Sequence, residues 1–165
     1  MTLPGSRLSN AAGVAGVLLS LSFAYFYLQK HLELEACPLC LIDRGLMLVI
    51  GAMFLLALIF NPGRLGQRIF SSIALLFSGL GIAVCLRHLW LQSLPKDQVP
   101  ECSPGLHYML ETFPIGETLR TIFNSAGECA EIQWTFLGLS IPAQTLLVFL
   151  GFTALSLLQI LRKKD

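Results

Sequence analysis

The chain has 165 residues, of which 55% are hydrophobic and only 13% are charged, and its mean hydropathy is +0.71. Soluble domains carry about 25% charged residues, so this composition is that of an integral membrane protein. The net charge is only +1, and the basic residues stand singly or in a short tail. Because nucleic-acid-binding surfaces need clustered basic residues, no nucleic acid is expected as a partner.

Four apolar segments follow one another along the chain, and each has roughly the 20 residues that a helix needs to cross the hydrocarbon core. Their continuous apolar runs lack the alternation of a β-barrel. We therefore predict an all-α membrane protein with a single domain over residues 1–165, a four-transmembrane-helix bundle. The first segment has some features of a signal peptide, but its length, its late lysine and the three further spans favour an uncleaved helix. The predicted spans are 11–29, 41–60, 69–91 and 143–161.

The basic residues outside the spans indicate how the bundle is oriented. Six of them would lie on one side of the membrane and three on the other, namely Arg7, Arg64, Arg68, Arg162, Lys163 and Lys164 against Lys30, Lys96 and Arg120. The positive-inside rule then places both termini in the cytoplasm. The loops 30–38 and 92–142 are expected to face outward.

Four of the five cysteines fall on this outer side: Cys37, Cys40, Cys102 and Cys129. An outer, oxidising compartment permits disulfides. Four cysteines allow three pairings, and the sequence does not choose among them.

The stretch "CPLCLIDRG" begins at Cys37, immediately before the second span. Pro38 suits the first turn of a helix, where its missing N–H group has no partner to lose, so the motif is predicted at the helix N-terminus. That position stabilises a thiolate, and Arg44 lies on the same face as Cys40, one turn deeper. A Cys40 thiolate is therefore favoured, and it would be a good leaving group and electron donor. The alternative is a static disulfide, with Arg44 reaching toward the lipid head groups.

A second polar group, in "CLRHLW" at residues 85–90, reaches the outer boundary at the end of the third span. Together with Arg44, the side chains of Arg87 and His88 could polarise the oxygens of a flat, uncharged ligand dissolved in the bilayer. The alternative is interfacial anchoring by Arg87, His88 and Trp90. Cys85 is interpreted as a small buried hydrophobic residue.

The long outer loop carries the remaining cysteines. Cys102 lies in "VPECSPG", where the flanking prolines hold it extended and exposed. Residues 116–124 place Leu119, Ile122 and Phe123 on one face of a short amphipathic helix, which would rest on the membrane surface or pack in the ordinary way. Such a tether would leave Cys102 free to meet a soluble partner while Cys129 stays close to the Cys37 pair.

An all-cysteine zinc site is the main competing interpretation of the four outer cysteines. Structural zinc sites normally bring two close pairs of ligands, whereas Cys102 and Cys129 are far apart in the sequence. No metal is therefore expected.

Two stretches make the chain resemble the DsbB family, the quinone-dependent disulfide-generating proteins of the bacterial inner membrane. "CPLCLIDRG" is similar to the family's Cys-x-x-Cys with an arginine four residues later, and "GECAEIQWTFLGLSIP", residues 127–142, is similar to the stretch around its last cysteine. The loop cysteines follow the Cys-x-x-Cys here. In the vitamin K epoxide reductase family, which has a similar architecture, they precede it, so an enzyme that runs in the reductive direction is disfavoured.

The resemblance implies a mechanism and its partners. A reduced periplasmic DsbA-like protein of the thioredoxin fold would attack Cys102 of a Cys102–Cys129 disulfide, and the released Cys129 would attack Cys37. Cys40 would then pass electrons to ubiquinone or menaquinone, with Arg44 steadying the charge and His88 near the quinone. At rest, Cys37–Cys40 and Cys102–Cys129 are expected as disulfides.

Two other functions remain open at this stage. One is a DsbB-like paralogue that serves a single dedicated substrate. The other is a non-catalytic membrane scaffold whose disulfides only staple its outer loops, although a scaffold has no need of Arg44 one turn below Cys40.

Overall fold

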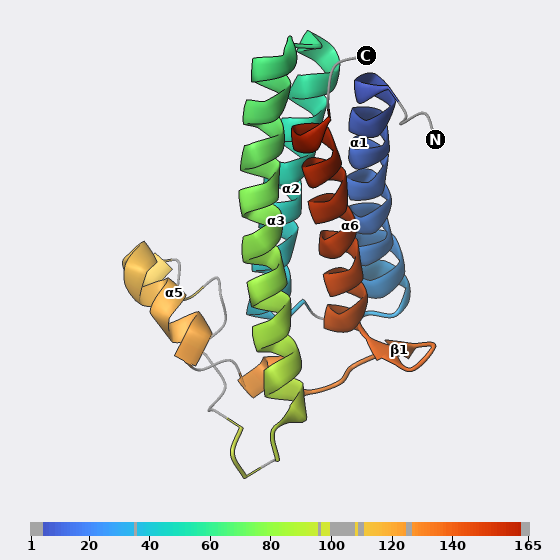
Figure 1. Cartoon of the computed structure of the whole chain (residues 1–165). Coiled ribbons are helices and arrows are strands. Elements are labelled where there is room, and N and C mark those ends of the chain that lie inside the picture. The colour runs from blue at the N-terminus through green and yellow to red at the C-terminus, as the bar shows by residue number, and fades with distance from the viewer. Residues whose placement is uncertain are drawn as a thin grey trace.

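Four long helices form the body of the protein in the computed structural model, which describes residues 5–34, 36–95, 97–99, 108, 111–124 and 127–162, with only the backbone at 118, 119, 122–124 and 128 (Figure 1). Each of the four is long and apolar enough to cross a membrane, which confirms the predicted all-α membrane fold. The first runs from Ser6 to His31, because α1 (Ser6–Ser22) continues directly into the π-helix η1 (Phe23–His31). The others are α2 (Pro38–Phe60), α3 (Arg64–Ser93) and α6 (Ile141–Leu161).

The helices pack side by side, with α3 against both α2 and α6, and α1 against α2. The beginning of α1, the end of α6 and the turn between α2 and α3 lie at one end of the bundle (Figure 1). The Cys-x-x-Cys motif, at the start of α2, lies at the other end. Placement of the first end in the cytoplasm remains a prediction.

The residues of the turn between α2 and α3 explain why α2 ends at Phe60 and α3 begins at Arg64. Asn61 has a φ of 40°, the left-handed conformation that ends a helix. Pro62 follows and has no N–H group to continue the helical hydrogen bonds. Gly63 then caps the start of α3.

The end of the first span departs from α-helical geometry. Over Phe23–His31 the backbone is a π-helix, and the N–H group of Leu32 donates to the carbonyl of Tyr27 at 3.0 Å. π-helical segments occur frequently at functional sites. Here the segment borders the cavity described below.

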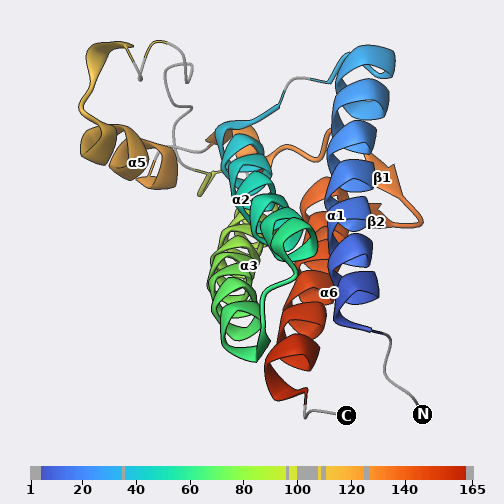
Figure 2. The same ribbon diagram turned by 90° about the horizontal axis from the view of Figure 1, so that it is seen from above.

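The segment between α3 and α6 contains a short helix and a small hairpin. Helix α5 (Ile115–Asn124) confirms that the predicted stretch is helical, and it lies to the side of the four-helix bundle in two perpendicular views (Figures 1 and 2). The expected apolar face formed by Leu119, Ile122 and Phe123 falls outside the described side chains. After the 3-10 turn η2 (Gly127–Ala130), the chain forms the strands β1 (Thr135–Phe136) and β2 (Leu139–Ser140).

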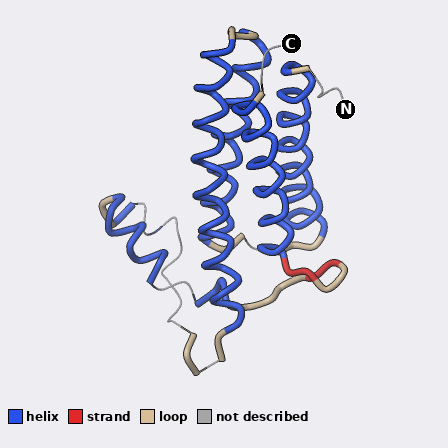
Figure 3. The backbone as a smooth tube through the Cα atoms, in the orientation of Figure 1, coloured by secondary structure: helices blue, strands red, loops and turns tan. Residues whose placement is uncertain are grey.

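The hairpin of β1 and β2 is a feature that the sequence analysis did not anticipate (Figure 3). Its strands pair antiparallel, with Thr135 opposite Ser140. Leu137 and Gly138 form the turn and both have positive φ, 52° and 79°, which is the requirement of a type I′ hairpin turn. The hairpin leads directly into α6.

Close packing between the spans depends on glycine. A Cβ atom at Gly81 of α3 would lie 2.4 Å from ring atoms of Phe149 in α6, and one at Gly13 of α1 would lie 2.6 Å from the ring of Phe54 in α2. Phe149 and Phe54 are fully buried. Small residues at helix interfaces let the spans approach closely where no hydrophobic force drives them together.

A buried cluster of amide side chains joins three of the spans at the end of the bundle opposite the cysteines. Asn10 of α1 and Gln67 of α3 exchange two hydrogen bonds of 3.1 Å. Gln67 also donates to Gln159 of α6 and to Ser71. We refer to Asn10, Gln67, Ser71 and Gln159 as the amide cluster.

Candidate redox site

The two cysteines of the motif lie where the sequence places them, at the N-terminus of α2. Cys37 is the N-cap residue, its sulfur accepts a hydrogen bond from the backbone N–H group of Cys40 at 3.4 Å, and Pro38 occupies the first turn. The two sulfur atoms are 2.7 Å apart and both cysteines are free thiols. The structure thus holds the pair in contact but unbonded, and the Cys37–Cys40 disulfide expected at rest stays a prediction.

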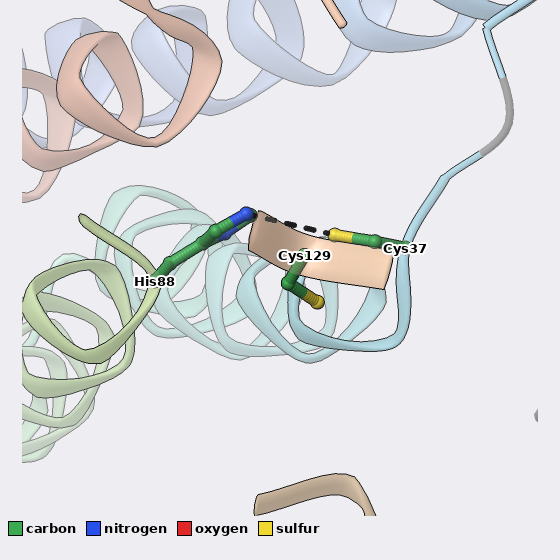
Figure 4. A group of neighbouring side chains, drawn as sticks. All are labelled: Cys37, His88 and Cys129. Atoms are coloured by element: carbon green, nitrogen blue, oxygen red, sulfur yellow. Dashed lines mark hydrogen bonds between the residues drawn. The ribbon is translucent and has the colours of Figure 1, made fainter. Parts of the chain in front are cut away.

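Cys129 and His88 converge on Cys37 from distant parts of the chain (Figure 4). One nitrogen or sulfur atom from each of the three residues lies within 4.8 Å of the other two. Nε2 of His88 is 3.9 Å from the Cys37 sulfur, while Cys129 is almost completely buried, with 1% of its surface exposed. The structure therefore brings Cys129 of the long loop beside the motif.

The surroundings of Cys37 disfavour its ionisation. The hydrogen bond with Cys129 lowers the pKa of the Cys37 thiol, but the hydrogen bond with Cys40, the loss of hydration on burial and the charge of Cys40 outweigh it and raise that pKa to about 12. The Cys37 thiol thus keeps its proton at neutral pH.

A cavity of about 160 Å³ lies below the motif, between α1, α2, α3 and α6. Its wall is mainly apolar, and its polar lining comes from Ser20, Gln29, Cys40, Asp43, Arg44, His88, Gln133, Gln144 and Thr145. A second, smaller hollow of about 20 Å³ is lined by Cys37, Cys40 and Cys129. Cys40 and His88 border both, so the motif stands between the outer loop and the larger cavity.

Arg44 lies one turn below Cys40, as the spacing predicts, and both residues line the cavity. Its guanidinium donates to Oε1 of Gln29 at 2.7 Å and to the carbonyl of Ala24 at 3.4 Å. Both acceptors belong to the π-helical end of the first span. Arg44 is therefore held by η1 at the edge of the cavity.

The two residues of α3 that were predicted to bind a ligand, Arg87 and His88, lie in different surroundings. His88 is buried and lines the cavity, and its Nδ1 has no hydrogen-bond partner in the part of the chain that the structure describes. Arg87 stacks on the ring of Trp90, 4.5 Å from its centroid, and within the described part of the chain it is not among the residues that line the cavity. That position is the one expected for interfacial anchoring.

Asp43 is a cavity residue that was not among the predicted site residues. It is 4% exposed and its Oδ2 accepts a hydrogen bond from the Cys85 thiol at 3.6 Å. A charged residue inside an apolar segment is itself a signal of function, and that signal was available in the sequence. Cys85 is fully buried in the main core cluster, in line with its interpretation as a small hydrophobic residue.

The set of Cys37, Cys129 and His88 has the chemistry of a zinc site as well as that of a sulfur-exchange site. It differs from the all-cysteine set considered from the sequence, because His88 replaces Cys102. The contact between Cys37 and Cys40 adds a second sulfur that can leave when Cys37 is attacked, and this favours exchange. The absence of a metal stays a prediction, and Cys102 lies outside the described residues.

The sequence of the chain is similar to those of known proteins. The sequence matches the family described as disulfide bond formation protein DsbB over residues 6–159. The chain belongs to the DsbB family. Among its curated relatives, the disulfide bond formation protein B of Hahella chejuensis is 51% identical over 78% of both chains. That of Nitrosococcus oceani is 48% identical over 81% of this chain and 79% of its own, and that of Methylococcus capsulatus is 43% identical over 96% of both.

Membership fixes the general role of the protein. DsbB relatives are disulfide bond formation proteins, so the chain is a multi-pass membrane oxidoreductase that functions in disulfide formation. This role gives a function to the sulfur cluster at the Cys-x-x-Cys end of the bundle.

Proposed function

We propose that this protein reoxidises a periplasmic thioredoxin-fold dithiol oxidase of the DsbA type and passes the electrons to ubiquinone or menaquinone in the bacterial inner membrane. One observation carries the proposal. The loop residue Cys129 lies beside Cys37, with their sulfurs within 4.8 Å, while Cys40 contacts Cys37 on one side and lines the membrane-depth cavity on the other. The sulfurs thus form a continuous path from the outer loop to the cavity.

Sulfur exchange along this path follows from the chemistry of the residues. The partner's thiolate attacks Cys102 of a Cys102–Cys129 disulfide and releases Cys129. Cys129 then attacks Cys37 of the Cys37–Cys40 disulfide, and Cys40 leaves as a thiolate. The raised pKa of Cys37 supports this order, since Cys37 resists carrying the negative charge.

The cavity below Cys40 has the features of a quinone site. Its surface is mostly apolar and carries polar groups among the apolar ones, as small-molecule sites generally do. Nδ1 of His88 is a buried polar atom that no described residue pairs with, which suits a ligand oxygen. A bound quinone supplies an acceptor for two electrons, and Arg44 and His88 are the residues that would hold its oxygens.

A non-catalytic scaffold stapled by disulfides would not require this arrangement. It has no use for a cavity directly below Cys40 or for an arginine held at its edge by two hydrogen bonds. The geometry therefore favours an enzyme.

The decisive measurement is quinone-dependent oxidation of a reduced thioredoxin-fold dithiol by the purified protein in lipid vesicles. We expect turnover with the wild type, loss of turnover in Cys40→Ser, and near-normal turnover in Cys85→Ala, because Cys85 lies outside the exchange path. Equal rates in the wild type and Cys40→Ser would contradict the proposal. So would turnover that does not depend on added quinone.

A further inference from the structure

Asp43 occupies an unusual position for a carboxyl group. It lies within α2, a span of the membrane, and only 4% of its surface is exposed. It lines the same cavity as Cys40, which lies three residues earlier in the chain on the same face of the helix. Carboxyl groups inside membrane spans are costly and commonly mark proton relays.

The contacts of Asp43 do not neutralise a charge on it. Oδ2 accepts one hydrogen bond, from the weakly polar thiol of Cys85, and Oδ1 is buried with no hydrogen-bond partner among the described residues. The neighbouring Arg44 directs its guanidinium donors to Gln29 and to the backbone of Ala24. A purely structural aspartate is expected to have its oxygens satisfied, so these contacts leave the carboxyl group without a structural explanation.

The other titratable groups of the cavity do not account fully for the delivery of protons. The titratable side chains that line it besides Asp43 are Cys40, Arg44 and His88. Cys40 gives electrons in the proposed function, and arginine does not release its proton in proteins. Among the described lining residues, only His88 and Asp43 remain as groups that can deliver a proton.

We infer that Asp43 is a proton donor for quinone reduction, which deepens the proposed function and rests on it. Oxidation of the Cys37 and Cys40 thiols to a disulfide releases two electrons and two protons, and the quinone takes up two of each to form the quinol. Asp43 gives one proton to a quinone oxygen as the O–H bond forms. It then regains a proton that the thiols have released, so the carboxyl group is unchanged over the cycle.

The first test is spectroscopic and does not depend on turnover. In quinone-free protein, infrared spectra recorded in H₂O and D₂O should show a carboxylic C=O band that shifts on deuteration. We expect this band to be missing in Asp43→Asn, and to be displaced in Cys85→Ala, because that substitution removes only the hydrogen bond to Oδ2. A band that persists in Asp43→Asn would overturn the assignment.

The second test is the rate of quinone-dependent dithiol oxidation. Asp43→Asn keeps the shape of the side chain but cannot donate the proton in the same way, and we expect turnover to fall about 100-fold. Asp43→Glu keeps the carboxyl group and should stay within about tenfold of the wild type. Formation of the mixed disulfide between Cys102 and the partner should be unchanged in both variants.

These results separate the inference from the proposed function. Wild-type turnover in Asp43→Asn, with the wild type fully quinone-dependent, would overturn the proton-donor role alone. A wild type that oxidises no dithiol with quinone would overturn the proposed function and this inference with it.

Discussion

Arg44 is held across the interface between two spans, since its donors reach Gln29 at 2.7 Å and the Ala24 carbonyl at 3.4 Å. If this residue only anchored α2 to head groups, lysine would replace it with little effect, because lysine also reaches the interface. A guanidinium is a planar fork of donors, whereas an ammonium is a mobile and strongly hydrated point charge. The two-acceptor geometry therefore makes the exchange to lysine a sharp test.

We predict that Arg44→Lys and Arg44→Gln weaken quinone use by roughly ten- to hundredfold, since each loses a charge-assisted hydrogen bond worth about 1.5–3 kcal/mol. The loss should appear as a raised quinone Michaelis constant or slower turnover, with the mixed disulfide at Cys102 formed normally. Arg87→Gln is the matched control, because Arg87 lies over Trp90 and should leave quinone kinetics unchanged. Normal quinone kinetics in both Arg44 variants at equal protein levels would exclude the role.

The raised pKa of the Cys37 thiol gives a second prediction about a single residue. With its pKa raised to about 12, the thiolate fraction in the fully reduced protein should grow about tenfold per pH unit from about pH 7 to pH 11. The rate of alkylation of Cys37 by iodoacetamide, followed by mass spectrometry, should grow in parallel. An unperturbed cysteine, with a pKa of about 8.5, would instead level off near pH 9. Such a plateau at Cys37 would contradict the assignment.

The sequence was informative about single residues where chemistry depends on neighbours in the chain. It predicted the motif at a helix N-terminus, Arg44 one turn below Cys40, and the buried character of Cys85. It did not reveal the contact between Asp43 and Cys85, or that Arg87 turns toward Trp90. Those contacts depend on how α2 and α3 pack and on side-chain rotamers, and neither is encoded in residue spacing.

At the scale of elements, the four spans follow from hydrophobicity alone. The helices nevertheless extend beyond the predicted runs, for example Arg64–Ser93 against 69–91, because polar residues at the ends continue the backbone hydrogen bonds. The hairpin of β1 and β2 was not anticipated, since two-residue strands give no periodic signal. Its turn, with positive φ at Leu137, carries no sequence mark except Gly138.

The contact between α3 and α6 yields a matched pair of substitutions. Gly81→Ala would place a methyl group against the buried ring of Phe149, whereas Gly79→Ala on the same helix meets nothing within 4 Å. Overpacking costs about 1–3 kcal/mol, while replacing a helical glycine gains up to about 1 kcal/mol. We expect a lower unfolding temperature in detergent for Gly81→Ala and an unchanged or higher one for Gly79→Ala. Equal behaviour of the two would show that this interface is loosely packed.

At the scale of the whole molecule, the chain brings together sulfurs from α2 and from the loop before α6. If both Cys40 and Cys102 are replaced by serine, Cys37 and Cys129 should form a disulfide on mild oxidation, because their sulfurs lie within 4.8 Å. Non-reducing peptide mapping detects it. In the wild type, the same mapping should give Cys37–Cys40 and Cys102–Cys129 at rest.

The control for this experiment replaces Cys37 as well, so that Cys85 and Cys129 remain. Cys85 is enclosed in the helix core, so no disulfide should form. Failure of Cys37 and Cys129 to pair, in protein that is correctly inserted, would remove the geometric basis of the exchange path.

The amide cluster has a consequence for how the protein is made. Asn10 and Gln67 satisfy each other as soon as α1 and α3 are in the membrane, but the acceptor on Gln159 belongs to the last span. A chain interrupted before α6 would lack Gln159, so Gln67 could donate only to Asn10 and Ser71. The side of the cluster that α6 covers would then face lipid, where polar groups are costly. The last span therefore completes the enclosure of the amide cluster, and we expect a chain that lacks α6 to be less stable in the membrane than one that has it.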